Sequence, residues 1–102
     1  MAITKKFLKT KPVCKVTFKI APEKGKNFTS AYLLGDFNEW DTKATPMKKL
    51  KNGGFSVSID LDINEEYKFR YLFDGITWDN DEDADKSVPT PFGVDEDSVI
   101  IV

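Results

Sequence analysis

The sequence contains no histidine and only one cysteine, Cys14. Without histidine the chain cannot build a Ser/His or Cys/His nucleophile pair, nor a histidine-ligated zinc site. A lone cysteine cannot form an internal disulfide, and Cys14 lies in an alternating pattern that predicts a place in the core. These absences remove the commonest nucleophilic and metal chemistries.

Carboxylates are plentiful, but their placement does not favour catalysis. A glycosidase needs one acid held in an apolar pocket, whereas nearly every acid here lies in a run or turn that we expect to be exposed. The acidic run from Asp79 to Asp85 starts like a calcium loop. Such a loop requires glycine where this chain has Ala84 and glutamate where it has Thr90. We therefore expect no enzyme activity, no cofactor and no bound metal.

The chain also lacks a strong charge of either sign and any long hydrophobic run. A net charge of −2 offers no general attraction to nucleic acid or to anionic membranes. Near the N-terminus only Phe7 and Leu8 are apolar among several lysines, which is too little for a signal peptide. We expect a cytoplasmic protein that binds neither nucleic acid nor membranes.

The length of 102 residues predicts a single domain. Residues 1–11 are basic and show no periodicity, so we expect a flexible N-terminal tail before a domain at residues 12–102. Pro89 and Pro91 argue against regular structure around them.

Within that domain, apolar and polar residues alternate with the period of half-buried strands. The clearest segments are residues 14–20, 55–61 and 67–73, and shorter strands are expected near 30–34, 76–78 and 98–102. Strands that recur about every ten residues, with turns between them, predict an all-β, antiparallel β-sandwich.

One stretch, Leu34-Gly35-Asp36-Phe37-Asn38-Glu39-Trp40, places two aromatic residues in a turn at the end of a strand. Glycine permits a sharp exit from the strand, and the Asp and Asn side chains can hold a tight turn. We expect one aromatic residue to enter the core and the other to face out. A rigid, exposed tryptophan offers a flat apolar face with a polar edge, which suits a sugar ring.

The second tryptophan, Trp78, follows an Asp-Gly hairpin signal at residues 74–75. A two-residue loop would pair it with Tyr71 and turn it inward. A three-residue loop of residues 73–75, with glycine in the left-handed position, would pair Leu72 with Ile76 and Arg70 with Trp78. We favour the second arrangement, in which Trp78 joins Lys68 and Arg70 on the outer face of the sheet.

Several motifs together closely resemble the family 48 carbohydrate-binding modules. They are LGDFNEW at 34–40, YKFRY at 67–71, Asp-Gly at 74–75, WDND at 78–81 and Phe-Gly at 92–93. The family includes the glycogen-binding domain of the AMP-activated protein kinase β subunit and the N-terminal modules of branching and debranching enzymes. The resemblance covers about residues 13–102 and implies an immunoglobulin-like β-sandwich that binds α-1,4-linked glucans without catalysis.

The resemblance also implies binding residues. Trp40 and Trp78 match the family's two sugar-stacking tryptophans, and Phe92 matches its bulky apolar residue. The basic residue is Arg70 when counted back from the Asp-Gly turn and Lys68 when matched through the Tyr-Lys-Phe triplet. We favour Arg70, although both lie on one strand face.

Two positions depart from the kinase-type members of the family. Where those members bind sugar hydroxyls with threonine and asparagine, this chain has Val94 and Glu96. Glu96 can still accept hydrogen bonds from hydroxyls. The alternative function for this chain is a protein-protein interaction or regulatory module on the same fold that has lost or weakened glucan binding. The expected partners are an α-glucan and a separate glycogen-active enzyme or kinase-type protein.

Overall fold

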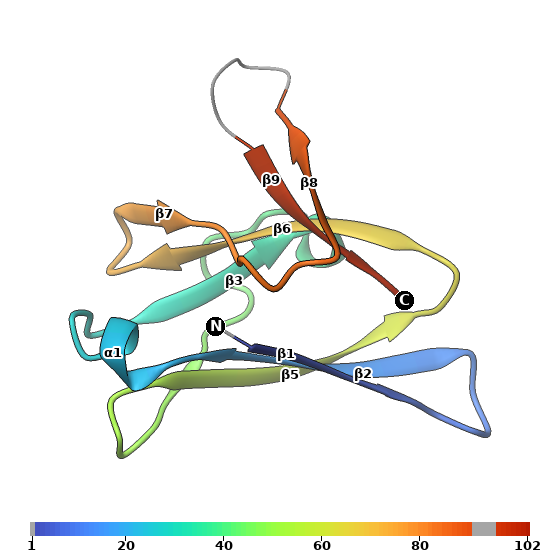
Figure 1. Cartoon of the computed structure of the whole chain (residues 1–102), viewed down its shortest axis with the longest axis horizontal. Helices are drawn as coiled ribbons and strands as arrows, with labels where there is room; N and C mark the ends of the chain where they lie inside the picture. Colours follow the sequence, from blue (N-terminus) through green and yellow to red (C-terminus); the bar gives the residue numbers. More distant parts are fainter. Residues whose placement is uncertain (1, 91–95) are drawn as a thin grey trace.

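The computed structural model describes residues 2–90 and 96–102, which form two antiparallel sheets packed face to face (Figure 1). Its elements in chain order are β1 (Ala2–Phe7), β2 (Val13–Ile20), α1 (Pro22–Gly25), β3 (Ala31–Gly35), the short 3₁₀ helix η1 (Asp36–Asn38), β4 (Lys48–Lys49), β5 (Phe55–Asp62), β6 (Glu66–Phe73), β7 (Thr77–Asp79), β8 (Lys86–Pro89) and β9 (Glu96–Ile101). The predicted all-β sandwich is confirmed.

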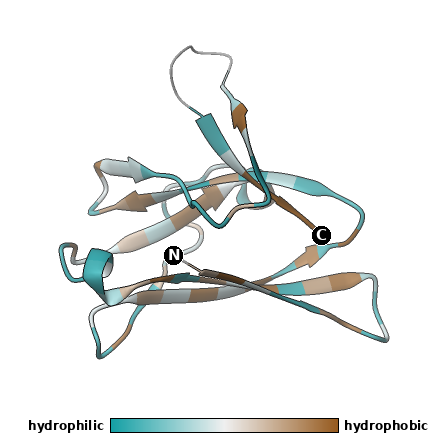
Figure 2. Ribbon diagram, viewed as in Figure 1, coloured by the Kyte–Doolittle hydropathy of each residue, from teal (hydrophilic) through white to brown (hydrophobic). Residues whose placement is uncertain are grey.

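The first sheet has the strand order β1-β2-β5-β4 and the second β3-β6-β9-β8, with β7 paired to β6. In the first sheet, the register pairs Cys14 with Leu61 and Phe18 with Val57, so the predicted apolar faces of β2 and β5 meet the core together. Phe69, Tyr71 and other β6 residues complete the core from the second sheet. Figure 2 shows that β9 ends in a hydrophobic run, whereas α1 is hydrophilic.

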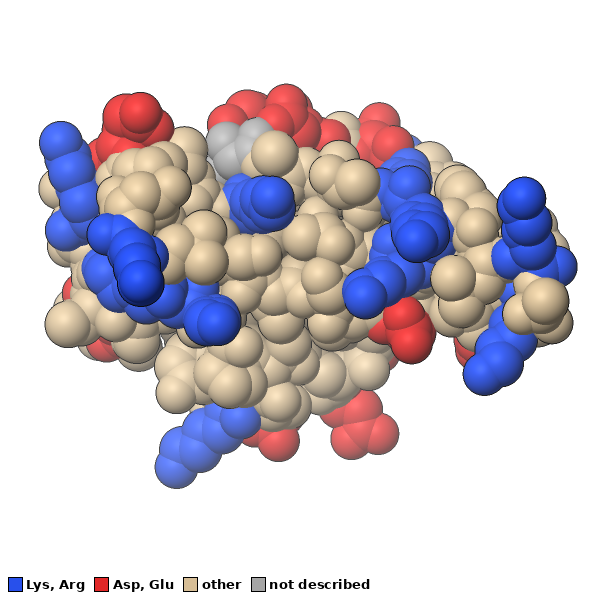
Figure 3. All heavy atoms as spheres, turned by 90° about the horizontal axis from the view of Figure 1, so that it is seen from below, with Lys and Arg blue, Asp and Glu red and all other residues tan. Residues whose placement is uncertain are grey.

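The outer face of the β1-β2-β5-β4 sheet is polar. Its middle row joins Thr4, Thr17 and Ser58, and the last two hydroxyls lie 2.8 Å apart. Figure 3 shows separated lysines around a broad uncharged area on this face. Neither tryptophan belongs to this sheet, so the predicted aromatic surface must be sought on the second sheet.

In the described chain, no helix has the length and apolar character needed to cross a bilayer.

The N-terminal segment differs from the flexible tail that we expected. Ala2–Phe7 forms β1 and pairs with β2 along its whole length. The Lys5 ammonium also bonds to the Asp85 carboxylate at 2.7 Å and to the Ile101 carbonyl at 2.8 Å. Strand pairing and these contacts order a segment whose weak hydrophobic pattern gave no strand signal.

The segment that leads up to residue 90 also differs from expectation. Pro89 does not prevent regular structure, because it is the last residue of β8, which pairs with β9. The strand order places β8 at the edge of its sheet, where a missing N–H donor is tolerated. Pro91 lies outside the described residues.

The acidic run is not wholly exposed, because Asp81 is 3% exposed. Its carboxylate accepts a hydrogen bond of 2.6 Å from the Tyr71 hydroxyl, and its N–H donates to the Ser98 hydroxyl at 2.9 Å. Asn80 beside it accepts hydrogen bonds from both the N–H and the hydroxyl of Ser98. A phenol on the core face of β6 therefore draws one acid of the run inward, which the local sequence could not indicate.

We predict that Tyr71→Phe destabilises the fold in a pH-dependent manner. Burial raises the pKa of Asp81 above its ordinary value of 3.8, and the Tyr71 hydrogen bond opposes that rise. At pH values between the unfolded and the folded pKa of Asp81, the folded chain retains a proton that the unfolded chain has released. The contribution of Asp81 to stability therefore falls as the pH rises through this range. Without the phenol, the buried carboxylate loses a donor, and the free energy of unfolding at pH 7 should fall by about 1–3 kcal/mol.

The loss should shrink below the folded pKa of Asp81, because the protonated acid depends less on a donor. Urea unfolding of both proteins at neutral pH and at an acidic pH at which Asp81 is protonated in the folded chain measures the difference. Tyr32→Phe is the matched control, because the Tyr32 hydroxyl makes no hydrogen bond within the described residues. An equal loss for Tyr71→Phe at both pH values would contradict the prediction.

Candidate functional site

The turn after β3 begins at a glycine that the packing requires. A Cβ atom on Gly35 would lie 2.4 Å from the Lys68 carbonyl oxygen and 2.8 Å from the Phe37 ring. Only glycine allows β3 to approach β6 this closely and then turn into η1. The close approach brings the turn residues directly beside β6.

Asn38 closes the turn from inside. Its side-chain oxygen accepts the Gly35 N–H at 3.0 Å, while its amide group donates to the Leu33 carbonyl at 2.8 Å and the Thr45 hydroxyl at 2.9 Å. The Trp40 N–H bonds to the Gly35 carbonyl at 3.0 Å. These bonds hold Trp40 at a positive φ of 57°, a backbone conformation that few non-glycine residues adopt.

The two aromatic residues of the turn take opposite directions, as the sequence predicted. The Phe37 ring lies 6.4 Å from the Phe18 ring and 6.1 Å from the Tyr67 ring, so it packs against the core. Trp40 lies on the outer side of the sheet, where it lines a hollow. The turn at Gly35 thus directs Phe37 into the core and Trp40 toward the surface hollow.

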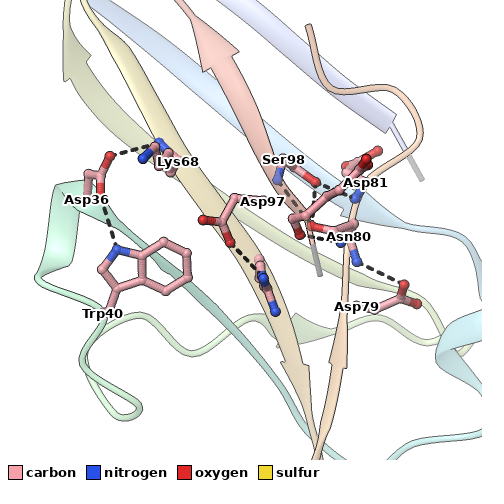
Figure 4. Close-up of polar contacts among 10 residues, drawn as sticks. Asp36, Trp40, Lys68, Asp79, Asn80, Asp81, Asp97 and Ser98 are labelled. Carbon is pink, nitrogen blue, oxygen red and sulfur yellow. Dashed lines mark hydrogen bonds and ion pairs between the residues drawn. The ribbon is translucent and has the colours of Figure 1, made fainter. Parts of the chain in front are cut away.

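The Asp36 carboxylate fixes the orientation of the indole. One oxygen accepts the Trp40 Nε1–H at 3.0 Å, and the other accepts the Lys68 backbone N–H at 3.0 Å (Figure 4). The indole is therefore tied to β6 through one carboxylate. Because Asp36 occupies the indole N–H, the flat ring face is the part of Trp40 that remains for a ligand.

The β6–β7 hairpin places Trp78 on the outer face, but in a register one step from the predicted one. Leu72 pairs with Trp78 and Phe73 with Thr77, so the loop consists of residues 74–76. Asp74 and Gly75 both have positive φ values, of 52° and 75°, whereas the expected loop placed only the glycine in the left-handed conformation. Trp78 is 47% exposed.

Asp74 also anchors the hairpin to the preceding chain. Its carboxylate oxygen accepts the backbone N–H groups of Thr29 at 2.8 Å and Ser30 at 2.9 Å. These bonds hold the pKa of Asp74 below its ordinary value. The hairpin that carries Trp78 is therefore attached to the segment that enters β3.

Arg70 lies in the row of outward residues on β6 and lines the same hollow as the two tryptophans. Its Nε donates to the Asp97 carboxylate at 2.6 Å, and both side chains are largely buried, at 16% and 13% exposed. Among the described residues this bond uses one of the five guanidinium N–H donors, so the terminal nitrogens keep their donors there. Asp97 fixes Arg70 without consuming its capacity to bind a ligand.

These elements enclose an open hollow of about 390 Å³ on the outer face of the second sheet. Its lining residues are Asp36, Trp40, Lys68, Arg70, Trp78, Thr90 and Asp97. Four residues singled out in the sequence therefore meet in one place, and both candidates for the basic residue, Lys68 and Arg70, contribute to it. We did not predict Asp36, Thr90 or Asp97 as lining residues. Asp36 was expected only to hold the turn, and no local pattern distinguishes Thr90 and Asp97 from other surface residues.

The remaining sequence candidates lie elsewhere or outside the described chain. Glu96 is exposed at the start of β9, and its carbonyl accepts a hydrogen bond of 2.9 Å from the Asn80 side chain. It is not among the described residues that line the hollow. Phe92 and Val94 fall outside the described residues.

One group of acids in the described chain brings carboxylate oxygens within 4.8 Å of one another, and it consists of Asp81, Glu82 and Asp83. Asp81 already accepts hydrogen bonds from the Tyr71 hydroxyl and the Asp83 N–H. The Asp81 carboxylate is therefore already engaged in hydrogen bonds that hold the connection between β7 and β8.

Comparison with known proteins bears on the identity of this sandwich. A search among curated proteins finds no match. The sequence model of carbohydrate-binding module 48, described as the isoamylase N-terminal domain, matches residues 26–87. The match covers more than half of the chain and includes Trp40, Lys68, Arg70 and Trp78. The chain therefore belongs to the carbohydrate-binding module 48 family.

Proposed function

We propose that the chain binds α-1,4-linked glucan, such as glycogen or a maltooligosaccharide, by stacking sugar rings on Trp40 and Trp78. One observation carries this proposal: two indoles, one from the turn after β3 and one from β7, line a single open hollow together with two cationic side chains. The choice of an α-glucan among carbohydrates rests on the family resemblance of the sequence.

The lining of the hollow suits the two kinds of surface on a glucose ring. The apolar C–H face can lie on an indole plate, while hydroxyls at the rim reach donors on Arg70 and Lys68 and acceptors on Asp97. Hydrogen bonds within the protein already orient Trp40 and Arg70. Little side-chain conformational entropy would therefore be lost on binding.

We further propose that the module binds without catalysis. A glycosidase would need an acid of raised pKa beside the bound sugar. Burial does raise the pKa of Asp81, but that carboxylate is bonded to Tyr71 and does not line the hollow. The carboxylates that do line it, Asp36 and Asp97, are engaged in orienting Trp40 and Arg70.

A shallow surface of this kind should bind one chain end with micromolar to millimolar affinity. Several chain ends on one glycogen particle would raise the apparent affinity when the module is part of an assembly. In this proposal, the module works in the cytoplasm and brings a glycogen-active enzyme or a kinase-type partner to the polysaccharide.

We predict that Trp40→Ala and Trp78→Ala each weaken binding to glycogen and to maltoheptaose by about tenfold or more, because each removes a stacking plate. Affinity electrophoresis in glycogen-containing gels and calorimetric titration with maltoheptaose measure the loss. Phe7→Ala is the matched control, since Phe7 is an exposed aromatic residue on β1. Circular dichroism establishes that each variant remains folded.

A wild-type chain that binds neither glucan would contradict the proposal and favour the protein-interaction module. Wild-type binding that survives in both tryptophan variants would place the glucan site elsewhere.

A second prediction concerns Asp36. Removing its carboxylate in Asp36→Ala should weaken maltoheptaose binding by roughly threefold to tenfold, because a hydrogen bond of about 1 kcal/mol no longer orients the Trp40 indole. Fluorescence anisotropy decay in a Trp78→Phe background, where Trp40 is the remaining tryptophan, should show a more mobile indole. Asp60→Ala, an exposed acid on β5, is the control. An indole of unchanged mobility would contradict the positioning role of Asp36.

A further inference from the structure

Two leucines are buried on the outer face of the second sheet, away from the core between the sheets. Leu34 is fully buried and Leu72 is 4% exposed, yet neither belongs to the central hydrophobic cluster. Leu34 pairs with Arg70 and Leu72 pairs with Trp78, so both leucines lie in the rows of residues that form the candidate site. The chain thus buries a small apolar floor beneath its ligand-binding face.

The register extends this floor past the first hollow. Tyr32 on β3 pairs with Leu72 on β6, which pairs with Trp78 on β7. Paired residues of antiparallel strands point to the same side, so these three side chains form one row. Two strand spacings separate Tyr32 from Trp78, a distance of about 10 Å. The row therefore carries an aromatic residue at each end and an apolar residue between them.

A second hollow, of about 260 Å³, lies at the Tyr32 end of this row. It is lined by Tyr32, Thr42, Lys43, Leu72 and Gly75. Within the described chain, the Tyr32 hydroxyl and the Lys43 ammonium make no hydrogen bond or ion pair. The second hollow thus offers an aromatic ring, a cation and hydroxyls over an apolar floor, which are the components of the first hollow.

The same segments supply both hollows. The loop that begins with Trp40 in the first hollow continues to Thr42 and Lys43 in the second. On the other strand, Leu72 follows Arg70 by two residues and so shares its outward face. A ligand made of repeated units could therefore bind the same kinds of groups twice while crossing one continuous surface.

We propose that Tyr32, Thr42 and Lys43 form a second sugar-binding subsite, which takes a further part of the same glucan chain that lies on Trp40 and Trp78. This inference rests on the proposed glucan-binding function and specifies its ligand as an oligosaccharide long enough to cover both hollows. Tyr32 supplies a second apolar plate, and Lys43 and Thr42 bind hydroxyls at its rim. The affinity of the module therefore depends on chain length.

The test compares maltose, which can occupy one hollow, with maltoheptaose, which can span both. Calorimetric titration of the wild-type chain should show tighter binding of maltoheptaose. Tyr32→Ala and Lys43→Ala should each reduce maltoheptaose affinity by roughly threefold to tenfold and leave maltose affinity unchanged. Phe7→Ala and Lys48→Ala, both exposed positions of the other sheet, are the matched controls.

Amide chemical shifts of the wild-type chain provide a readout that does not depend on variant folding. Saturating maltoheptaose should shift the signals of Thr42, Lys43 and Gly75, and maltose should not. Glucan binding that needs both tryptophans but shows neither these shifts nor any effect of Tyr32→Ala and Lys43→Ala would overturn the second subsite and leave the proposed function intact. Absence of binding to either sugar by the wild-type chain would overturn both.

Discussion

The site depends on one steric constraint, the close approach of β3 to β6 at Gly35. A side chain at this position would collide with the Lys68 carbonyl oxygen and the Phe37 ring. The approach brings Asp36 within hydrogen-bonding distance of the Lys68 N–H, and the same carboxylate then reaches the Trp40 indole. A single missing Cβ atom thus allows the loop to dock on the sheet and the tryptophan to be oriented.

The other half of the site is held by buried polar groups. Trp78 lies on the short strand β7, and Asn80 and Asp81, just beyond it, bond to Ser98 on β9. Asp97, the neighbour of Ser98, orients Arg70. Because buried polar atoms must find partners, this network sets the positions of β7 and β9 relative to each other. The aromatic and cationic parts of the hollow are therefore placed by contacts beneath the surface.

Much of the architecture could be read from local patterns. Strict alternation in β2, β5 and β6 correctly predicted which residues face the core, because a period of two leaves little ambiguity about the buried face. The turn at Gly35 and the outward direction of Trp78 were also predicted correctly. The errors concern β1, β8 and Asp81, whose structures depend on partners distant in the sequence: β2, β9 and Tyr71. The hairpin register was wrong because Asp74 is held by Thr29 and Ser30, far along the chain.

By itself, the sequence determined the sandwich class, the alternating core faces and the residue types of an aromatic binding surface, since hydrophobic periodicity and turn chemistry act over a few neighbouring residues. Only the tertiary structure decided that Trp40, Arg70 and Trp78 share one hollow with Asp36 and Asp97, and that Tyr32 extends the same face. These residues come from different strands and loops. Their proximity follows from strand register and from bonds between distant polar groups, which no short stretch of sequence contains.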